Sequence, residues 1–153
     1  MWSKEEVRNR NIRFYTNFGI YMKKHAKEHG EKIRWVNYRT GLNTVHFKLD
    51  TFKNSSKVCI DITSKDKGVR EVFFEQFEEF KTLLSIRMDK LDWIQEYRID
   101  SGIYITRIYT ELRGPSINKE SDWGEIYRFF EKNILALHDF WELSQDVFKD
   151  LES

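Results

Sequence analysis

Cysteine and proline are nearly absent from this sequence, which has one of each, Cys59 and Pro115. A single cysteine cannot form a disulfide within the chain, and this favours a reducing compartment. No run of apolar residues is long enough to span a membrane. The N-terminal residues, which include Glu5 and Glu6, lack the apolar core of a signal peptide. The sequence therefore predicts a cytoplasmic protein without a membrane partner.

Recognisable catalytic motifs are also missing. The 7 glycines stand singly, so the sequence has no glycine-rich phosphate loop. It has no cysteine pair for zinc, and Cys59 has no sequence neighbour that would lower the pKa of its thiol. His25 and His29 are four residues apart, as two metal ligands on a helix would be, but histidine near a helix end is also a favourable cation. We therefore expect no bound metal and no cofactor.

Net charge is small, because 26 basic and 25 acidic residues leave a formal charge of +1. A chain-wide attraction to polyanions is thereby excluded, and any contact with nucleic acid must be a local patch. Aromatic residues, in contrast, make up 16% of the chain. That much apolar area can build a core without disulfides, so we expect residues 1–153 to form a single ordered domain.

Three runs of β-branched and aromatic residues, at 32–38, 44–50 and 57–63, predict a meander of antiparallel strands. A hairpin is predicted over 93–99 and 103–110. Amphipathic helices are predicted from a capping box at Ser3 and Glu6 to Gly30, over 66–88, and from Ser121 to the C-terminus. The order α-β-β-β-α-β-β-α predicts an α+β fold, in which one mainly antiparallel sheet packs against amphipathic helices in a single two-layer domain.

Alternation along the second and third strands assigns their side chains to two faces. One face is apolar and should be buried: Val45, Phe47, Leu49, Val58, Ile60 and Ile62. The other carries His46, Lys48, Lys57, Cys59 and Asp61, and Arg34 and Tyr38 from the first strand could lie beside them. The candidates for binding a phosphate or another polar ligand are Arg34, Tyr38, His46, Lys48 and Asp61. The alternative is a solvated sheet face with ordinary cross-strand charge pairs.

A nuclease site is the catalytic alternative. The opening order α-β-β-β-α-β matches the core of restriction-endonuclease-like nucleases, which need an aspartate and an acidic-x-lysine triplet to hold a divalent metal. Asp50, Asp61 and Lys65 are the candidate residues here. Thr63 stands where the lysine of the triplet is required, and Lys65 falls beyond it, so we expect no working site.

Several short motifs, found mainly from Phe73 onward, carry a resemblance to a known family. They are Phe73-Phe-Glu-Gln-Phe-Glu-Glu-Phe, Leu91-Asp-Trp93, Arg107-Ile-Tyr, Asp122-Trp123, Phe14-Tyr-Thr-Asn-Phe18 and Ile33-Arg-Trp-Val-Asn-Tyr38. With these motifs the chain resembles short, stand-alone members of a bacterial family catalogued as domain of unknown function 4268. In longer relatives such a domain follows a nuclease-like domain. The resemblance therefore implies, by association, a link to nucleic-acid metabolism or defence.

Taken together, these features favour a non-enzymatic binding or interaction module. Its partner is expected to be a nucleic acid, another protein or a second copy of the chain. Two alternatives stay open: the metal-dependent nuclease, and a structural homodimer favoured by an exposed hairpin edge and by the many aromatic residues.

Overall fold

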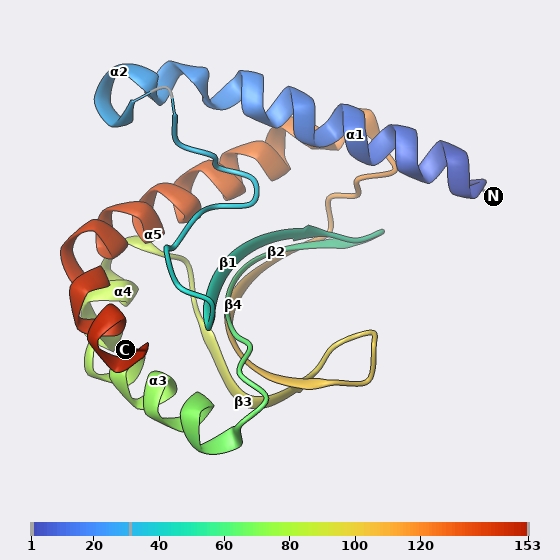
Figure 1. The fold of residues 1–153 in the computed structure, drawn as a ribbon. Helices are drawn as coiled ribbons and strands as arrows, with labels where there is room; N and C mark the ends of the chain where they lie inside the picture. The colour runs from blue at the N-terminus through green and yellow to red at the C-terminus, as the bar shows by residue number, and fades with distance from the viewer. Residues whose placement is uncertain (1, 31, 153) are drawn as a thin grey trace.

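Four antiparallel strands form one sheet in the residues that the computed structural model describes, 2–30 and 32–152. The strands are β1 (Val45–Thr51), β2 (Ser55–Ile62), β3 (Asp92–Arg98) and β4 (Tyr104–Arg113). Their order across the sheet is β1-β2-β4-β3. The sheet is strongly curved, and the hairpin of β3 and β4 projects away from the helices (Figure 1).

Helices cover the convex face of this sheet. They are α3 (Lys67–Glu79), α4 (Lys81–Arg87) and α5 (Trp123–Glu152), the last one preceded by the short helix η2 (Glu120–Asp122). The helix predicted over 66–88 is divided at Phe80, whose backbone leaves the helical conformation between α3 and α4. The apolar residues of β1 and β2 face these helices: Val45, Phe47, Val58, Ile60 and Ile62 are buried, and Leu49 is partly buried. The burial of the apolar face is therefore confirmed for both strands, but the opposite face of β2 is not solvated throughout, because Cys59 and Asp61 are also buried.

The N-terminal helix α1 (Lys4–Tyr21) begins at the predicted capping box. Ser3 Oγ accepts a hydrogen bond from the Glu6 amide, and a Glu6 side-chain oxygen accepts one from the Ser3 amide. The helix continues through η1 (Met22–His25) and α2 (Ala26–His29) and ends at Gly30, which has a φ of 91°. Phe14 and Phe18 attach α1 to α5 through buried aromatic contacts.

The segment 32–38 differs from the expectation. It lies beside β1, where the first strand was expected, but it pairs only through an isolated bridge between Tyr38 and Phe47. Asn37 explains the difference, because its φ of 58° is left-handed and interrupts an extended chain. Trp35 is buried in this segment and packs against His138 of α5. The α+β class, the single sheet and the order of helices and strands otherwise match the prediction.

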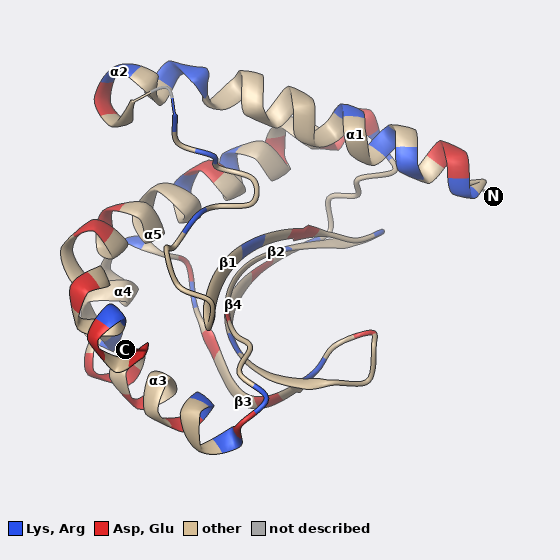
Figure 2. Ribbon diagram, viewed as in Figure 1, with Lys and Arg blue, Asp and Glu red and all other residues tan. Residues whose placement is uncertain are grey.

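Acidic and basic residues are interspersed along the ribbon, on the helices as well as on the strands (Figure 2). Within residues 2–30 and 32–152, no helix combines the length and the apolar character that crossing a bilayer requires.

Candidate functional site

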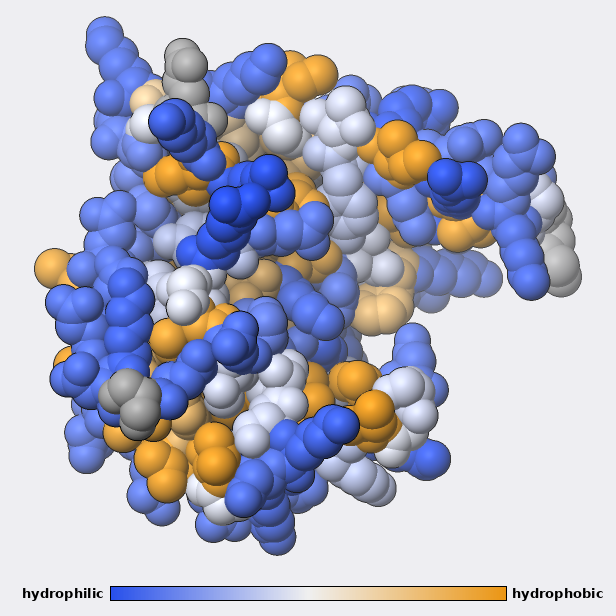
Figure 3. Space-filling model, viewed as in Figure 1, coloured by the Kyte–Doolittle hydropathy of each residue, from blue (hydrophilic) through white to orange (hydrophobic). Residues whose placement is uncertain are grey.

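The concave face of the sheet forms a groove of about 540 Å³. It is bounded by α1, by the β1–β2 hairpin and by the β3–β4 hairpin, and it is visible as a hollow between α1 and the β3–β4 hairpin in Figure 3. Residues from all three walls line it, among them Asn11 and Tyr15 of α1, Lys48, Asp50 and Lys57 of the first hairpin, and Tyr97 of β3. Of the described helices, α1 borders this face, while α3, α4 and α5 lie on the opposite face of the sheet (Figure 1).

A buried ionic network lies at the floor of the groove. Arg107 donates hydrogen bonds from Nε and Nη2 to the two carboxylate oxygens of Asp61, at 2.7 and 2.8 Å. Its Nη1 lies 3.7 Å from Asp50 Oδ2. The side chains of Asp61 and Arg107 are only 0% and 6% exposed. We call these three residues the Asp61–Arg107–Asp50 network.

Burial and charge act in opposite directions within this network. Burial disfavours the charge of Arg107, but the hydrogen bonds that Arg107 donates to Asp61, together with the nearby negative charges, outweigh it and raise the pKa of the guanidinium. Burial raises the pKa of Asp50, and the Arg107 charge partly offsets that rise. The arginine therefore holds two carboxylates in place beneath the groove, in a bidentate and a looser contact.

Two lysines and several aromatic rings lie on the walls above the network. Lys57 Nζ donates a hydrogen bond of 3.0 Å to the Tyr97 hydroxyl and lies 4.9 Å from the ring centre of Tyr109 and 5.3 Å from that of Phe52. Lys48 Nζ is 3.9 Å from Asp61 Oδ2, and its side chain is 52% exposed. Lys57 thus lies among aromatic rings, and Lys48 lines the same groove as a second cation.

The structure brings together only some of the predicted binding residues. Lys48 and Asp61 share the groove side of the sheet, and His46 lies at its end, where Nε2 is 3.0 Å from the Asn43 carbonyl oxygen. Tyr38 is elsewhere, because its hydroxyl is 2.6 Å from His138 Nδ1 of α5 on the helix-covered side. Arg34 is exposed in the segment that precedes Tyr38, and it contributes to a separate, smaller hollow.

Arg107 and Tyr97 are functional candidates that the sequence prediction missed. In the second hairpin, apolar residues occur at both odd-numbered and even-numbered positions, so the sequence could not show which face of the hairpin points inward. The structure shows the cause, a shift of register between Ile94 and Tyr97 where β3 pairs with β4. An arginine flanked by Thr106 and Ile108 inside a strand is the signal that could have indicated a buried ion pair.

Two of the three candidate nuclease residues are arranged around an arginine. Asp50 and Asp61 both approach Arg107, so a guanidinium lies where a metal ion would have to bridge them. Lys65 is exposed in the loop after β2, and its backbone carbonyl accepts a hydrogen bond from Arg70. Cys59 is buried beside the network, and burial raises the pKa of its thiol, which disfavours a reactive thiolate. The nuclease alternative stays a prediction, without support from this geometry.

A second polar cluster lies where α2 meets α5. His138 is buried, with Nδ1 next to the Tyr38 hydroxyl and Nε2 only 2.7 Å from Glu142 Oε1. Burial lowers the pKa of His138, while the negative charge of Glu142 opposes that shift. His25 Nε2 contacts Glu131 of α5 at 2.6 Å. The contact between α2 and α5 therefore brings together polar side chains that are far apart in the sequence and surrounds them with aromatic rings.

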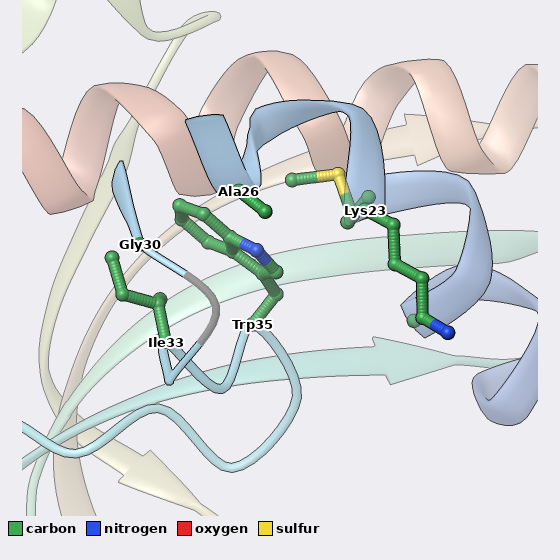
Figure 4. Close-up of a pocket in the computed structure, with 7 residues that line it drawn as sticks. Lys23, Ala26, Gly30, Ile33 and Trp35 are labelled. Carbon is green, nitrogen blue, oxygen red and sulfur yellow. The ribbon is translucent and has the colours of Figure 1, made fainter. Parts of the chain in front are cut away.

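A cavity of about 450 Å³ is lined by Trp35 and by residues from the end of α1 to Ile33. Apolar side chains of Met22, Ala26, Ile33 and Trp35 line part of it, and Figure 4 shows the Lys23 side chain directed away from the indole. The cavity offers shape and apolar surface but no convergent polar groups. It is a weaker candidate than the groove for a specific polar ligand.

The fold and the groove define a class of protein: an α+β domain whose curved antiparallel sheet is covered by helices on one face and leaves a charged concave face open. Within this class the chain belongs to the family described as Domain of unknown function (DUF4268), whose model matches residues 11–144. The match runs from α1 to α5 and includes every strand of the groove. The resemblance carried by the sequence motifs is thereby confirmed. None of the curated proteins compared with the chain matches it.

Proposed function

We propose that this chain is a non-enzymatic binding module, and that its groove binds single-stranded nucleic acid. The observation that carries the proposal is the placement of Lys57 among the rings of Phe52, Tyr97 and Tyr109, with Lys48 lining the same groove. Proteins that bind single strands combine cations that contact phosphates with aromatic faces on which bases stack. The open groove provides both kinds of group on one surface.

The charge of the groove supports a moderate affinity. Its lining holds four basic residues, Lys48, Lys57, Arg98 and Arg107, and two acidic ones, Asp50 and Asp100. Asp61 of the floor, which is paired with Arg107, reduces the surplus to about one positive charge. This corresponds to the neutralisation of about one phosphate, so the logarithm of the affinity should fall with log salt at a slope near −0.7. The ion pairs of the floor hold the side chains of Arg107 and Asp50 in fixed positions. These side chains therefore lose less conformational entropy when a ligand binds.

Fluorescence anisotropy with short single- and double-stranded DNA and RNA, titrated with salt, tests this proposal. Lys57→Gln should weaken single-strand binding and reduce the salt slope by about 0.7, because one phosphate contact is lost. Lys119→Gln is the matched control, since Lys119 is exposed and is not among the residues that line the groove. Equal effects of the two substitutions, or no single-strand binding at low salt, would exclude the groove as the site.

The same samples distinguish the nuclease alternative. They are incubated with magnesium or manganese and checked on gels for cleavage. Cleavage that depends on the metal would replace the module with a nuclease. Intact nucleic acid with salt-sensitive binding would support the module, for which we also propose a cytoplasmic setting and the association with nucleic-acid metabolism or defence that the family resemblance implies.

One observation favours the homodimer as a second candidate. Ile86 of α4 and Leu143 of α5 are 71% and 81% exposed, on the helical side opposite the groove. Leu143 also lines a shallow hollow together with Leu83 of α4. Exposed apolar side chains on two neighbouring helices are typical of a contact surface. A dimer formed there would leave the groove free, so the two functions are compatible.

A further inference from the structure

Three of the four histidines of the chain lie close together, although they come from distant segments. His29 ends α2, His138 lies in the middle of α5, and their ring centres are 5.0 Å apart. His25 follows at 6.3 Å from the ring of His29. A carboxylate is added by Asp139, and one ligand atom from each of His29, His138 and Asp139 lies within 4.8 Å of the other two.

We propose that His29, His138 and Asp139 bind a zinc ion. Two imidazole nitrogens and a carboxylate oxygen are a donor set that zinc accepts. Tetrahedral zinc with bonds near 2.1 Å places its ligand atoms ~3.4 Å apart, so these three have to approach by roughly an ångström. His29 and Asp139 are only partly buried, and rotation of their side chains can supply that movement.

The ligand nitrogen of His138 points to the same conclusion. His138 is only 4% exposed, and its Nε2 makes no hydrogen bond of good geometry. The Glu142 carboxylate lies against this nitrogen without being aligned for a hydrogen bond. A buried polar atom without a partner is costly, and a metal ion at Nε2 would satisfy it. Glu142 is close enough to provide a fourth oxygen ligand.

Surrounding residues hold the two rings in position. The Tyr38 hydroxyl is 2.6 Å from His138 Nδ1, which leaves Nε2 as the nitrogen for the metal. Such a contact on the second nitrogen orients the ring of a ligating histidine. Trp35 lies edge-on to the rings of His29 and His138, at 5.8 and 5.4 Å. Arg87 pairs with Oδ2 of Asp139.

Bound zinc would connect the end of α2 to α5. The helix α2 has only four residues and the segment that follows it makes a single bridge to the sheet, so few backbone contacts hold this region. A metal ion shared by His29 and the two α5 residues would attach it to the longest helix of the fold. The proposed role is therefore structural.

The test is a titration of metal-free, full-length protein with zinc by calorimetry, and with cobalt(II) by visible absorption. Wild-type protein should bind one zinc ion, and cobalt should give d–d bands of a site with nitrogen and oxygen ligands. At a free zinc concentration of 100 times Kd, the melting temperature should rise by about 5–10 °C, because zinc stabilises only the folded state.

His29→Gln is the informative variant, because His29 is partly exposed and its loss should not prevent folding. Zinc affinity should fall at least tenfold, since the loss of a mere supporting residue already costs about 10–100-fold. His46→Gln is the matched control, because His46 is the one remaining histidine and lies on the sheet. It should leave zinc binding unchanged. Absence of stoichiometric binding in the wild type, or equal zinc affinity in His29→Gln and the wild type, would overturn the proposal.

Discussion

Asp61 lies beneath the surface of the groove, where both of its carboxylate oxygens accept hydrogen bonds from Arg107. Asp61→Ala would leave the Arg107 guanidinium buried without its main partner. Breaking a buried ion pair in this way costs about 3–5 kcal/mol of unfolding free energy. Urea denaturation followed by circular dichroism measures the loss. The looser contact with Asp50 cannot replace the bidentate one.

An exposed ion pair gives the comparison for that prediction. Glu120→Ala removes the partner of Arg13, and the side chains of these two residues are 67% and 56% exposed. Because solvent screens such pairs, the cost should stay below about 1 kcal/mol. If Asp61→Ala costs no more than this control, the buried network contributes little to stability. If it costs more, the ion pair between Asp61 and Arg107 is a main contribution to the stability of the fold.

His138 should make stability depend on pH above the range in which carboxylates titrate. Burial lowers its pKa below 6.5, and His29 lowers it further, while Glu142 and Asp139 act in the opposite direction. The unfolded chain therefore binds this proton at a higher pH than the folded protein does. The neutral form stabilises the fold fully above pH 6.5, and this contribution is lost as the pH falls through the folded-state pKa.

The measurement for His138 is an NMR titration of the imidazole resonances in the presence of a chelator. Urea midpoints at pH 7.5 and 5.5 should show lower stability at the lower pH. Tyr38, whose pKa is raised by burial, stays protonated throughout and adds no charge. A His138 pKa above 6.5 would contradict the prediction, because it would mean that the carboxylates outweigh burial.

At the scale of elements, α5 is the longest helix and contributes many of the buried core residues. Phe148 is fully buried on its inner face, 4.3 Å from the ring centre of Phe77 and 5.2 Å from that of Trp141. Phe148→Ala should cost about 3–5 kcal/mol, because it removes apolar contact and leaves a cavity. Leu143→Ala on the outer face of the same helix should stay within about 0.5 kcal/mol. Thermal or urea unfolding of both variants measures the two losses of unfolding free energy. Equal losses would contradict the assignment of Phe148 to the inner face of α5 and of Leu143 to its outer face.

The same elements show what local sequence patterns can predict. Alternation in 45–49 and 58–62 correctly identified the buried faces of β1 and β2, because each residue of a strand turns its side chain to the opposite side. The pattern failed at 32–38, where apolar and aromatic side chains anchor a loop. Trp35 and Tyr38 contact His138, and the left-handed Asn37 prevents regular pairing. Composition cannot distinguish such anchoring from a strand.

At the scale of the whole molecule, the candidate sites depend on contacts between distant segments. Lys48 and Asp61 could be placed on one face from the alternation of two neighbouring strands. Arg107 joins them only through the pairing of β2 with β4, and the zinc ligands meet only when α5 folds back over α2. Nothing in the sequence near His29 indicates that His138 will lie beside it. The groove was therefore partly predictable, and the histidine cluster was not.

The oligomeric state is the last property that belongs to the molecule as a whole. Ile86 and Leu143 expose apolar surface on the helical side, and we expect this surface to bring two copies together as the protein concentration rises. Light scattering after size exclusion should give a mass above 18.7 kDa at high concentration. Leu143→Asp should restore the monomer, because it places a charge in the centre of the contact.

Ile20→Asp is the matched control for this dimer, since Ile20 is also exposed but lies on α1. It should leave the association unchanged, because the proposed contact uses only α4 and α5. A mass of 18.7 kDa at every concentration would remove the homodimer from consideration. A dimer that resists Leu143→Asp would instead have to use another surface, and β3 is the strand to test next because it forms an edge of the sheet. Association through that edge would bring two grooves side by side, and Lys57→Gln would then weaken single-strand binding in both copies at once.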